Sequence, residues 1–137
     1  MRMKPSLTLA DVRVIVAAAR AEAEKNGWAV TIAVVDEGGA LLSLERADGA
    51  FPQSAEIAFR KAWTAAAVRM PTKAMEDMVK DRPALVTFPG QVRVQGGLPI
   101  KSGTDCVGAV GVSGAASNQD EQCAQAGIAA LEAALRG

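Results

Sequence analysis

The chain has 137 residues, the length of one domain, and its 15 basic residues balance 15 acidic ones. No basic stripe or charged tail points to nucleic acid or a membrane surface as a partner, and no apolar run approaches the roughly 18 residues that a membrane span requires. Half of the residues are hydrophobic but only 4% are aromatic. We therefore expect a single cytoplasmic domain over residues 1–137, with a core built from Ala, Val, Leu and Ile.

The first part of the chain is typical of a helix followed by a β-hairpin. Thr8 and Asp11 form a Thr-x-x-Asp capping box, which predicts a helix that runs to about residue 27. Residues 28–35 are rich in β-branched side chains and are expected to form a buried strand. The Asp-Glu-Gly-Gly sequence that follows is typical of a tight turn, so residues 41–46 are expected to return beside that strand.

The rest of the chain predicts three further helices and three further strands. A helix over residues 53–69 should end before Pro71, because proline cannot continue the backbone hydrogen-bond ladder. A shorter helix capped by Thr72 follows, and Ser117 with Asp120 forms a Ser-x-x-Asp cap for the last helix. The strands are expected over residues 91–95, 98–101 and 106–113. Short turns join most strands, which favours an antiparallel sheet with helices on either side, an α/β (α+β) sandwich.

The absence of histidine limits the chemistry of any site. It excludes a Ser-His-Asp triad, a Cys-His dyad, a zinc site built on histidine and a histidine-ligated haem. The two cysteines, Cys106 and Cys123, have no metal-ligand spacing and are expected to be reduced and buried, so we expect no metal site.

The best candidate site is a glycine-rich elbow near the end of the chain. Gly96 and Gly97 form one flexible backbone segment, and Ser113 and Gly114 lie between the last strand and the last helix. Bare amides and a helix N-terminus suit a small anionic ligand. The alternative is close packing of the helix against a strand, which also favours glycine.

Four other side chains are candidates for the same site. Arg46, at a strand end, is suited to bind a carboxylate, and Asp48 is suited to pair with it or with Lys61. Lys61 and Thr64 share one helix face, and a partly buried lysine can act as a base. The alternatives are a salt bridge in a loop for Arg46 and Asp48, and a lysine whose stem packs on the core for Lys61.

The series of motifs along the chain resembles the GlcG/HbpS family, which includes the C-terminal domain of PduO-type proteins. The matching stretches are Val34-Val35-Asp36-x-Gly38-Gly39-x-Leu41, Arg46-x-Asp48-Gly49-Ala50, Lys61-Ala62-x-Thr64-Ala65, Pro71-Thr72, Gly96-Gly97-x-Pro99-Ile100 and Gly108-x-x-Gly111-Val112-Ser113-Gly114. The resemblance implies a profilin-like three-layer α/β/α sandwich around a five-stranded antiparallel sheet. It also implies homo-oligomers, from dimers to octamers.

The resemblance leaves three functions open: a binding module, an enzyme, and an accessory or scaffolding subunit that acts through an apolar oligomer surface. Members of the family bind haem, sense redox state with a partner kinase, or are encoded among genes of glycolate, diol or aromatic catabolism. We expect a binding module that holds a small anionic metabolite, or a tetrapyrrole by its carboxylates, at Arg46, Thr64, Gly96, Gly97, Ser113 and Gly114. The missing histidine disfavours haem as the cofactor. The alternative is an enzyme without metal or nucleotide, of the isomerase or lyase type, in which Lys61 or Asp48 moves a proton on a small carbonyl or hydroxy acid.

Overall fold

Helix α1 (Leu9–Asn26) begins at the predicted capping box. In the computed structural model, which describes residues 1–137, the Thr8 hydroxyl accepts a hydrogen bond from the amide of Asp11 and the Asp11 carboxylate accepts one from the amide of Thr8. The helix ends at Gly27, whose φ of 73° is the left-handed conformation that glycine adopts at low cost. Both ends of α1 are therefore set by local sequence.

The predicted hairpin is confirmed, with a later start than expected. Strand β1 (Thr31–Asp36) pairs antiparallel with β2 (Leu41–Arg46), and the first strand begins at Thr31 rather than Trp28. The Asp36 carboxylate accepts hydrogen bonds from the amides of Gly38 and Ala40. This side chain closes the turn in the way expected of an Asp before two glycines.

The sheet has four strands and not the five that we expected. Its order is β2-β1-β4-β3, with β3 (Gly97–Ser102) and β4 (Asp105–Ser113) forming a second antiparallel pair. Residues 91–95 form no strand. Their backbone is hydrogen-bonded to a neighbouring helix instead, since the Val92 amide donates to the Thr64 hydroxyl at 2.8 Å. The prediction of a strand there was wrong because this segment pairs with no strand of the sheet and is hydrogen-bonded to a helix side chain.

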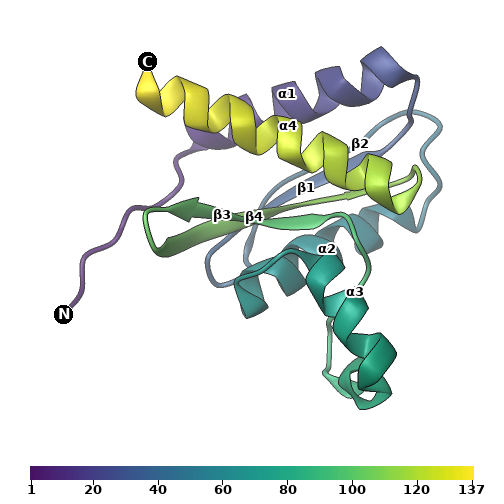
Figure 1. The fold of residues 1–137 in the computed structure, drawn as a ribbon. Coiled ribbons are helices and arrows are strands. Elements are labelled where there is room, and N and C mark those ends of the chain that lie inside the picture. The colour runs from purple at the N-terminus through teal and green to yellow at the C-terminus, as the bar shows by residue number, and fades with distance from the viewer.

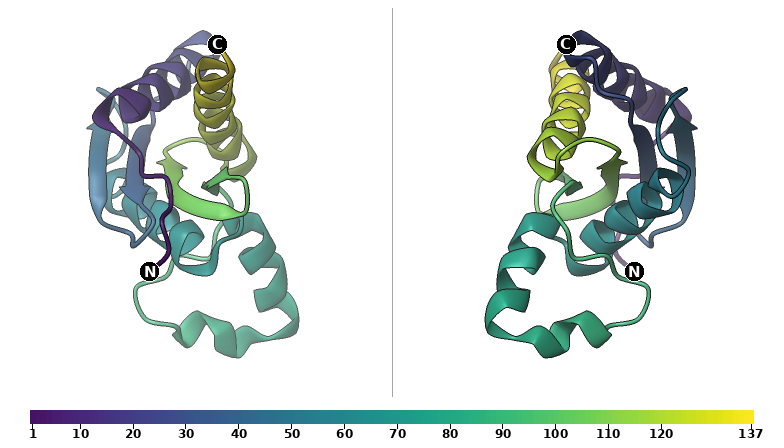
Figure 2. Two further views of the ribbon diagram at one scale, coloured as in Figure 1. Left: turned by 90° about the vertical axis from the view of Figure 1, so that its left-hand side faces the viewer. Right: turned by 90° about the vertical axis from the view of Figure 1, so that its right-hand side faces the viewer.

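Helices cover both faces of the sheet (Figure 1). Helices α1 and α4 (Ser117–Arg136) pack together on one face, and α2 (Ser54–Val68) lies across the other. Figure 2 shows that α3 (Thr72–Asp81) and the short 3-10 helix η1 (Pro83–Thr87) project from the α2 side as an arm. No helix is both long and apolar enough to cross a membrane.

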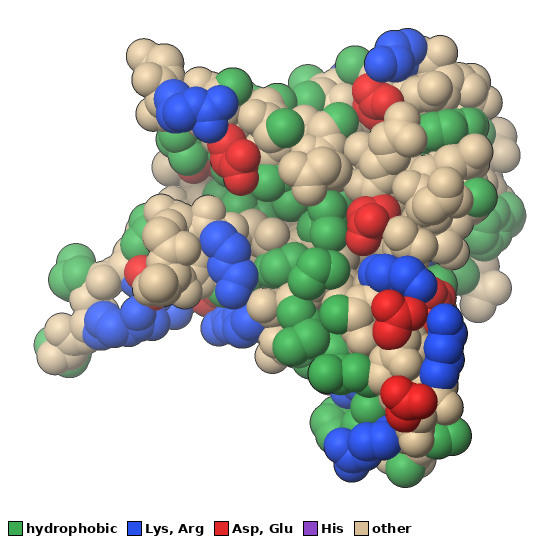
Figure 3. All heavy atoms as spheres, viewed as in Figure 1, with side chains coloured by type: hydrophobic (Ala, Val, Ile, Leu, Met, Phe, Trp, Pro, Cys, Tyr) green, Lys and Arg blue, Asp and Glu red, His purple; other side chains and the backbone are tan.

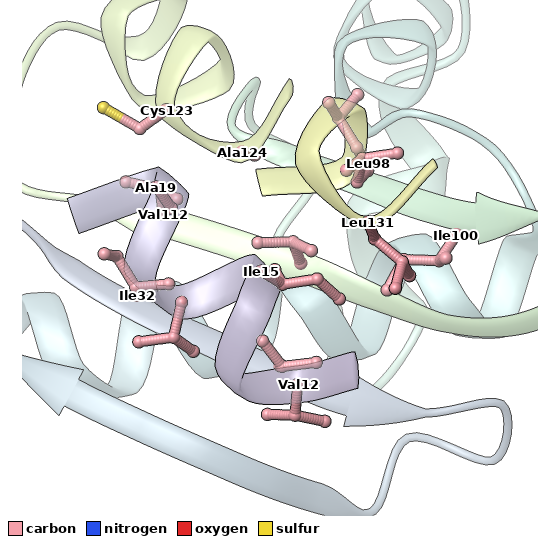
Figure 4. Close-up of a cluster of buried hydrophobic side chains, with 14 of the residues drawn as sticks. Val12, Ile15, Ala19, Ile32, Leu98, Ile100, Val112, Cys123, Ala124 and Leu131 are labelled. Atoms are coloured by element: carbon pink, nitrogen blue, oxygen red, sulfur yellow. The ribbon is translucent and has the colours of Figure 1, made fainter. Parts of the chain in front are cut away.

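The two faces of the sheet are packed differently. Seventeen buried residues fill the space between the sheet and helices α1 and α4, most of them Val, Ile and Leu (Figure 4). The α2 face is lined almost entirely by alanine. Gly111 of β4 is central there, because a Cβ at this position would overlap the Ala58 carbonyl and lie 2.5 Å from the Ala62 amide nitrogen. Small residues let α2 approach the sheet closely.

Two predicted helix caps were wrong. Residue 116 and not Ser117 precedes the first turn of α4, and Thr72 is the first residue of α3 and not its cap. The Thr72 hydroxyl accepts a hydrogen bond from the Gly97 amide at 2.9 Å. Asp120 does not complete a capping box with Ser117, because its carboxylate faces the protein interior. Tertiary contacts engage the Thr72 hydroxyl and the Asp120 carboxylate, so neither side chain caps its helix in the predicted way.

Candidate functional site

Lys61 of α2 and Asp120 of α4 form a buried ion pair at the centre of the predicted region. Lys61 Nζ lies 3.1 Å from Asp120 Oδ2, and both side chains are 3% exposed. The same ammonium group donates to the Val112 carbonyl at 3.0 Å. Lys61 therefore joins α2, β4 and α4, and its charge is balanced inside the protein.

Asp120 and Gln119 also engage the backbone amides at the start of α4, which were expected to face a ligand. Asp120 Oδ1 accepts a hydrogen bond from the Ala115 amide at 2.9 Å, and the neighbouring Ala116 amide donates to the side chain of Gln119. Burial raises the pKa of the Asp120 carboxyl, while the Lys61 charge and the Ala115 amide oppose that rise. The carboxylate of the chain itself is thus the anion at the start of α4.

Gly96 and Gly97 are glycines because the backbone passes directly over α2. A Cβ at Gly96 would lie 2.7 Å from Lys61 Nζ, and the φ of this residue is 135°. A Cβ at Gly97 would overlap the Lys61 carbonyl oxygen. The structure therefore brings Lys61, Gly96 and Gly97 together as predicted, but in close contact with one another and not around a hollow.

Thr64, Ser113 and Gly114 lie in or next to the same region. The Thr64 hydroxyl donates to the Arg60 carbonyl and accepts from the Val92 amide, so both of its roles are taken. Ser113 is buried, and a Cβ at Gly114 would lie 2.5 Å from the Ala29 carbonyl oxygen. None of the cavities of the protein is lined by these three residues.

Arg46 and Asp48 lie apart from this cluster. Both are exposed and neither forms an ion pair within the chain. Asp48 lines a cavity of about 400 Å³ beside the end of α1, together with Glu24, Glu45 and Arg20. Arg20 already binds Glu45 through two hydrogen bonds. Three carboxylates against one guanidinium make this cavity unfavourable for an anion.

A second cavity, of about 310 Å³, lies between α2 and the segment Phe88–Gly96, which we call the covering loop. Its lining consists of Gln53, Glu56, Ile57, Arg60, Gly90, Gln91 and Val92. The Arg60 guanidinium lies at the wall, with a long contact of 3.8 Å to Glu56. The hydrogen bond from Val92 to Thr64 and the contact of Gly96 with Lys61 hold the covering loop against the helix.

Arg93 of the covering loop is a site residue that sequence reasoning missed. It is only 8% exposed, and its Nε donates to the side-chain oxygen of Gln91 at 2.8 Å. Its guanidinium carbon lies 4.7 Å from the centre of the Phe88 ring. Its Nη1 is buried and has no hydrogen-bond partner, whereas every other buried side-chain nitrogen or oxygen has one. The available signal was a single arginine between two valines, inside the segment 91–95 that we predicted to be a strand.

The chain offers few donors for a metal or a haem iron. No group of three or more His, Cys, Asp or Glu side chains is placed to hold a metal ion. Among the usual haem ligands, histidine and tyrosine are absent from the sequence. Cys106 and Cys123 are buried, and burial raises the pKa of the Cys123 thiol to about 11. Methionine is present, but none of the five methionines and neither cysteine lines a cavity, so the residues present do not fit a site that ligates iron.

Comparison with known proteins gives a consistent result. A family model described as haem degrading protein HbpS-like matches residues 7–129. Protein GlcG of Escherichia coli K12 is 45% identical over 114 residues, which cover 82% of this chain and 85% of GlcG.

Solved structures share the fold. A double mutant of Streptomyces reticuli HbpS superposes with a TM-score of 0.89 at 39% identity, covering 94% of this chain and 89% of the other. A crystal structure of a PduOC:heme complex superposes with a TM-score of 0.86 at 28% identity, covering 92% of this chain and 95% of that one.

Proposed function

This chain belongs to the HbpS-like family, and we propose that it is a small-ligand-binding protein that holds an organic anion between helix α2 and the covering loop. The observation that carries the proposal is the cavity of about 310 Å³ with the Arg60 guanidinium on its wall. Behind that wall, Gln91 connects the cavity to the guanidinium of Arg93. Two cations against one carboxylate, Glu56, attract negative charge to this place.

This location replaces the elbow as the proposed site. The amides of Ala115 and Ala116 are engaged by Asp120 and Gln119, so they offer nothing to a ligand. The covering loop is continuous with Gly96 and Gly97, and its hydrogen bond to Thr64 joins it to the predicted cluster. The ligand would therefore bind on the outer side of the predicted residues.

A tetrapyrrole is one candidate for the organic anion, because the related PduOC protein forms a complex with heme. The carboxylates of a tetrapyrrole are groups that arginine binds well. Since the residues of this chain do not fit iron ligation, we propose that carboxylate and apolar contacts hold such a ligand. Iron should then add little to its affinity.

The test is a parallel titration with protoporphyrin IX and haemin, followed by quenching of the fluorescence of Trp28 and Trp63. We expect both to bind with dissociation constants within about threefold, because a missing metal bond leaves the remaining contacts equal; a tenfold ratio would correspond to about 1.4 kcal/mol. Arg60→Gln should weaken both equally. Strong preference for haemin, or no binding of either, would refute the tetrapyrrole form of the proposal.

Acid–base catalysis by Lys61 and Asp48 has less support. Lys61 is enclosed and bound to Asp120, whereas Asp48 lines the cavity beside α1. A base at Lys61 would first have to break a buried ion pair.

We also propose that the protein assembles with copies of itself. Strand β2 is at one edge of the sheet, and its Leu41, Leu42 and Leu44 side chains are each at least 39% exposed. The arm adds exposed apolar side chains among its charged ones (Figure 3). Sedimentation analysis of the double variant Leu42→Lys, Leu44→Lys should give a smaller particle than the native protein if β2 lies at an interface.

A further inference from the structure

The Arg93 guanidinium is a buried positive charge for which the chain provides no counterion. No carboxylate lies within 4 Å of it, in contrast to Lys61, whose charge is met by Asp120 at 3.1 Å. The Nη1 atom is enclosed and has no acceptor. A guanidinium keeps its charge in proteins, so this arrangement is costly unless something completes it.

We propose that Arg93 is the group that binds the carboxylate of the ligand, and that Phe88 is a movable cover over it. This inference rests on the proposed site between α2 and the covering loop. Hydrogen bonding of Nε to Gln91 fixes the plane of the guanidinium. The Nη1 and Nη2 edge is then left for the two oxygens of a carboxylate, which match it in a bidentate manner.

Phe88 controls access to this edge. Its ring lies over the guanidinium at 4.7 Å, yet the residue is 49% exposed. Residues 86–90 are all exposed, so little packing holds the ring in place. When the ring swings out, Nη1 becomes accessible from solvent. The cation–π contact with Phe88 thus holds Arg93 in place until a carboxylate replaces it.

The charge count indicates that one carboxylate group of the ligand binds at Arg93. One uncompensated positive charge is present, so a single negative charge neutralises it. A dianion such as sulfate or phosphate would leave an excess negative charge in a buried place, which is unfavourable. The planar carboxylate also fits the guanidinium edge better than chloride does, because chloride offers one acceptor atom.

The experiment measures the melting temperature of the whole chain at pH 7 in sodium acetate or sodium propionate, against sodium chloride and sodium sulfate at equal ionic strength. We expect a saturable rise of about 5–10 °C at a hundredfold excess of acetate over its dissociation constant. Arg93→Gln should abolish this rise and Arg93→Lys should reduce it strongly. The control is Arg82→Gln, which removes the same charge from an exposed residue of the arm and should keep the full response.

The Arg93→Gln variant is expected to fold, since the substitution removes a buried charge that has no partner. Its melting temperature in chloride should equal or exceed that of the native protein. Phe88→Ala, which removes the cover, should keep or increase the acetate response. A native protein that responds equally to acetate and chloride, or an Arg93→Gln variant that keeps the acetate response, would overturn the proposal.

Two further measurements distinguish this inference from an ion pair between two copies of the chain and from the proposed tetrapyrrole ligand. The alternative is that Arg93 pairs with a carboxylate of a second copy of the chain. In that case Arg93→Gln would change the sedimenting mass, and acetate would not change the melting temperature of the native protein. This result would contradict the proposal. Protoporphyrin IX binding is scored independently. If the native protein and Arg93→Gln bind protoporphyrin IX equally well, and also respond equally to acetate, the proposed function stands and the role of Arg93 is refuted. If the acetate response depends on Arg93 but protoporphyrin IX does not bind, the role of Arg93 is supported and the tetrapyrrole is refuted as the ligand.

Discussion

The two faces of the sheet show two ways of attaching a helix. Helices α1 and α4 rest on a layer of large aliphatic side chains, among them Ile15, Ile32 and Val110, and α4 also supplies Asp120 to the ion pair with Lys61. Helix α2 lies on alanines, and the directional contacts of Lys61 with the Val112 carbonyl and the Asp120 carboxylate fix its position. The first face gains stability from buried area, and the second gains a defined geometry from close approach and hydrogen bonds.

This difference indicates where ligand chemistry belongs. A layer of aliphatic side chains tolerates sliding and repacking at moderate cost. A helix held by a buried ion pair at close range has one position, so the side chains beside it are presented reproducibly. Arg60 and the covering loop are attached to that second helix.

The largest effect should come from removing the close approach itself. Gly111→Val would place side-chain atoms against the backbone of α2, at the Ala58 carbonyl and the Ala62 amide. Neither backbone atom can move without displacing the helix, so we expect a loss of more than about 4 kcal/mol in the free energy of unfolding. Urea denaturation measures this loss. Gly38→Ala is the control, because its Cβ would meet only the Asp36 side chain at 3.6 Å; equal losses in the two variants would contradict the account.

The ion pair should be the next most sensitive feature. Lys61→Met leaves the Asp120 carboxylate buried without its partner, which typically costs about 3–5 kcal/mol. Changing Asp120 to Asn in the same protein should recover part of that loss, because the uncompensated charge is gone. A double-mutant cycle in urea measures the coupling. Strictly additive losses would show that the pair does not act as a unit.

A substitution in the other layer should lower stability and leave binding intact. Ile15→Ala removes a fully buried side chain of α1 and should cost about 2–4 kcal/mol. Because Ile15 faces α4 and not the covering loop, the affinity for acetate or protoporphyrin IX should not change below the melting temperature. A loss of affinity with retained fold would mean that the two layers are coupled.

The smallest expected effect is a pH dependence from Asp120. Burial raises the pKa of its carboxyl above the ordinary value of 3.8 in the folded protein. Its contribution to stability is therefore complete below about pH 4 and is lost as the pH rises through the folded pKa. We expect the stability of the native protein relative to Asp120→Asn to fall as the pH is raised above about 4 in urea titrations. The carboxyls of Glu22, Glu45 and Asp77, whose pKa values are lowered by their partners, act in the opposite direction but cancel in this difference. A difference that rises with pH would contradict the assignment.

Local signals in the sequence were sufficient for most of the fold. The Thr8 capping box, the turn at Asp36 and the stop at Pro71 each act within a few residues, and each is observed at or next to its expected place. The prediction of a fifth strand failed because the backbone of residues 91–95 is hydrogen-bonded to Thr64 of α2, a tertiary contact that the alternation of residue types does not reveal.

The site was predicted only in part, because its decisive contacts join distant residues. Lys61, Gly96 and Gly97 do lie together. The partner of Lys61, however, is 59 residues away along the chain, and Asp120 had a satisfactory local explanation as a helix cap. Nothing local marks Arg93 as unpaired, since that property depends on which carboxylates the fold brings near it.

Hydrogen–deuterium exchange of the whole protein, with and without saturating protoporphyrin IX, tests the central claim most directly. We expect added protection in peptides that cover residues 53–70 and the covering loop, with no change in α1 and α4. Protection confined to α1 and to the cavity beside Asp48 would contradict the account, because the ligand would then lie against the aliphatic layer and away from α2.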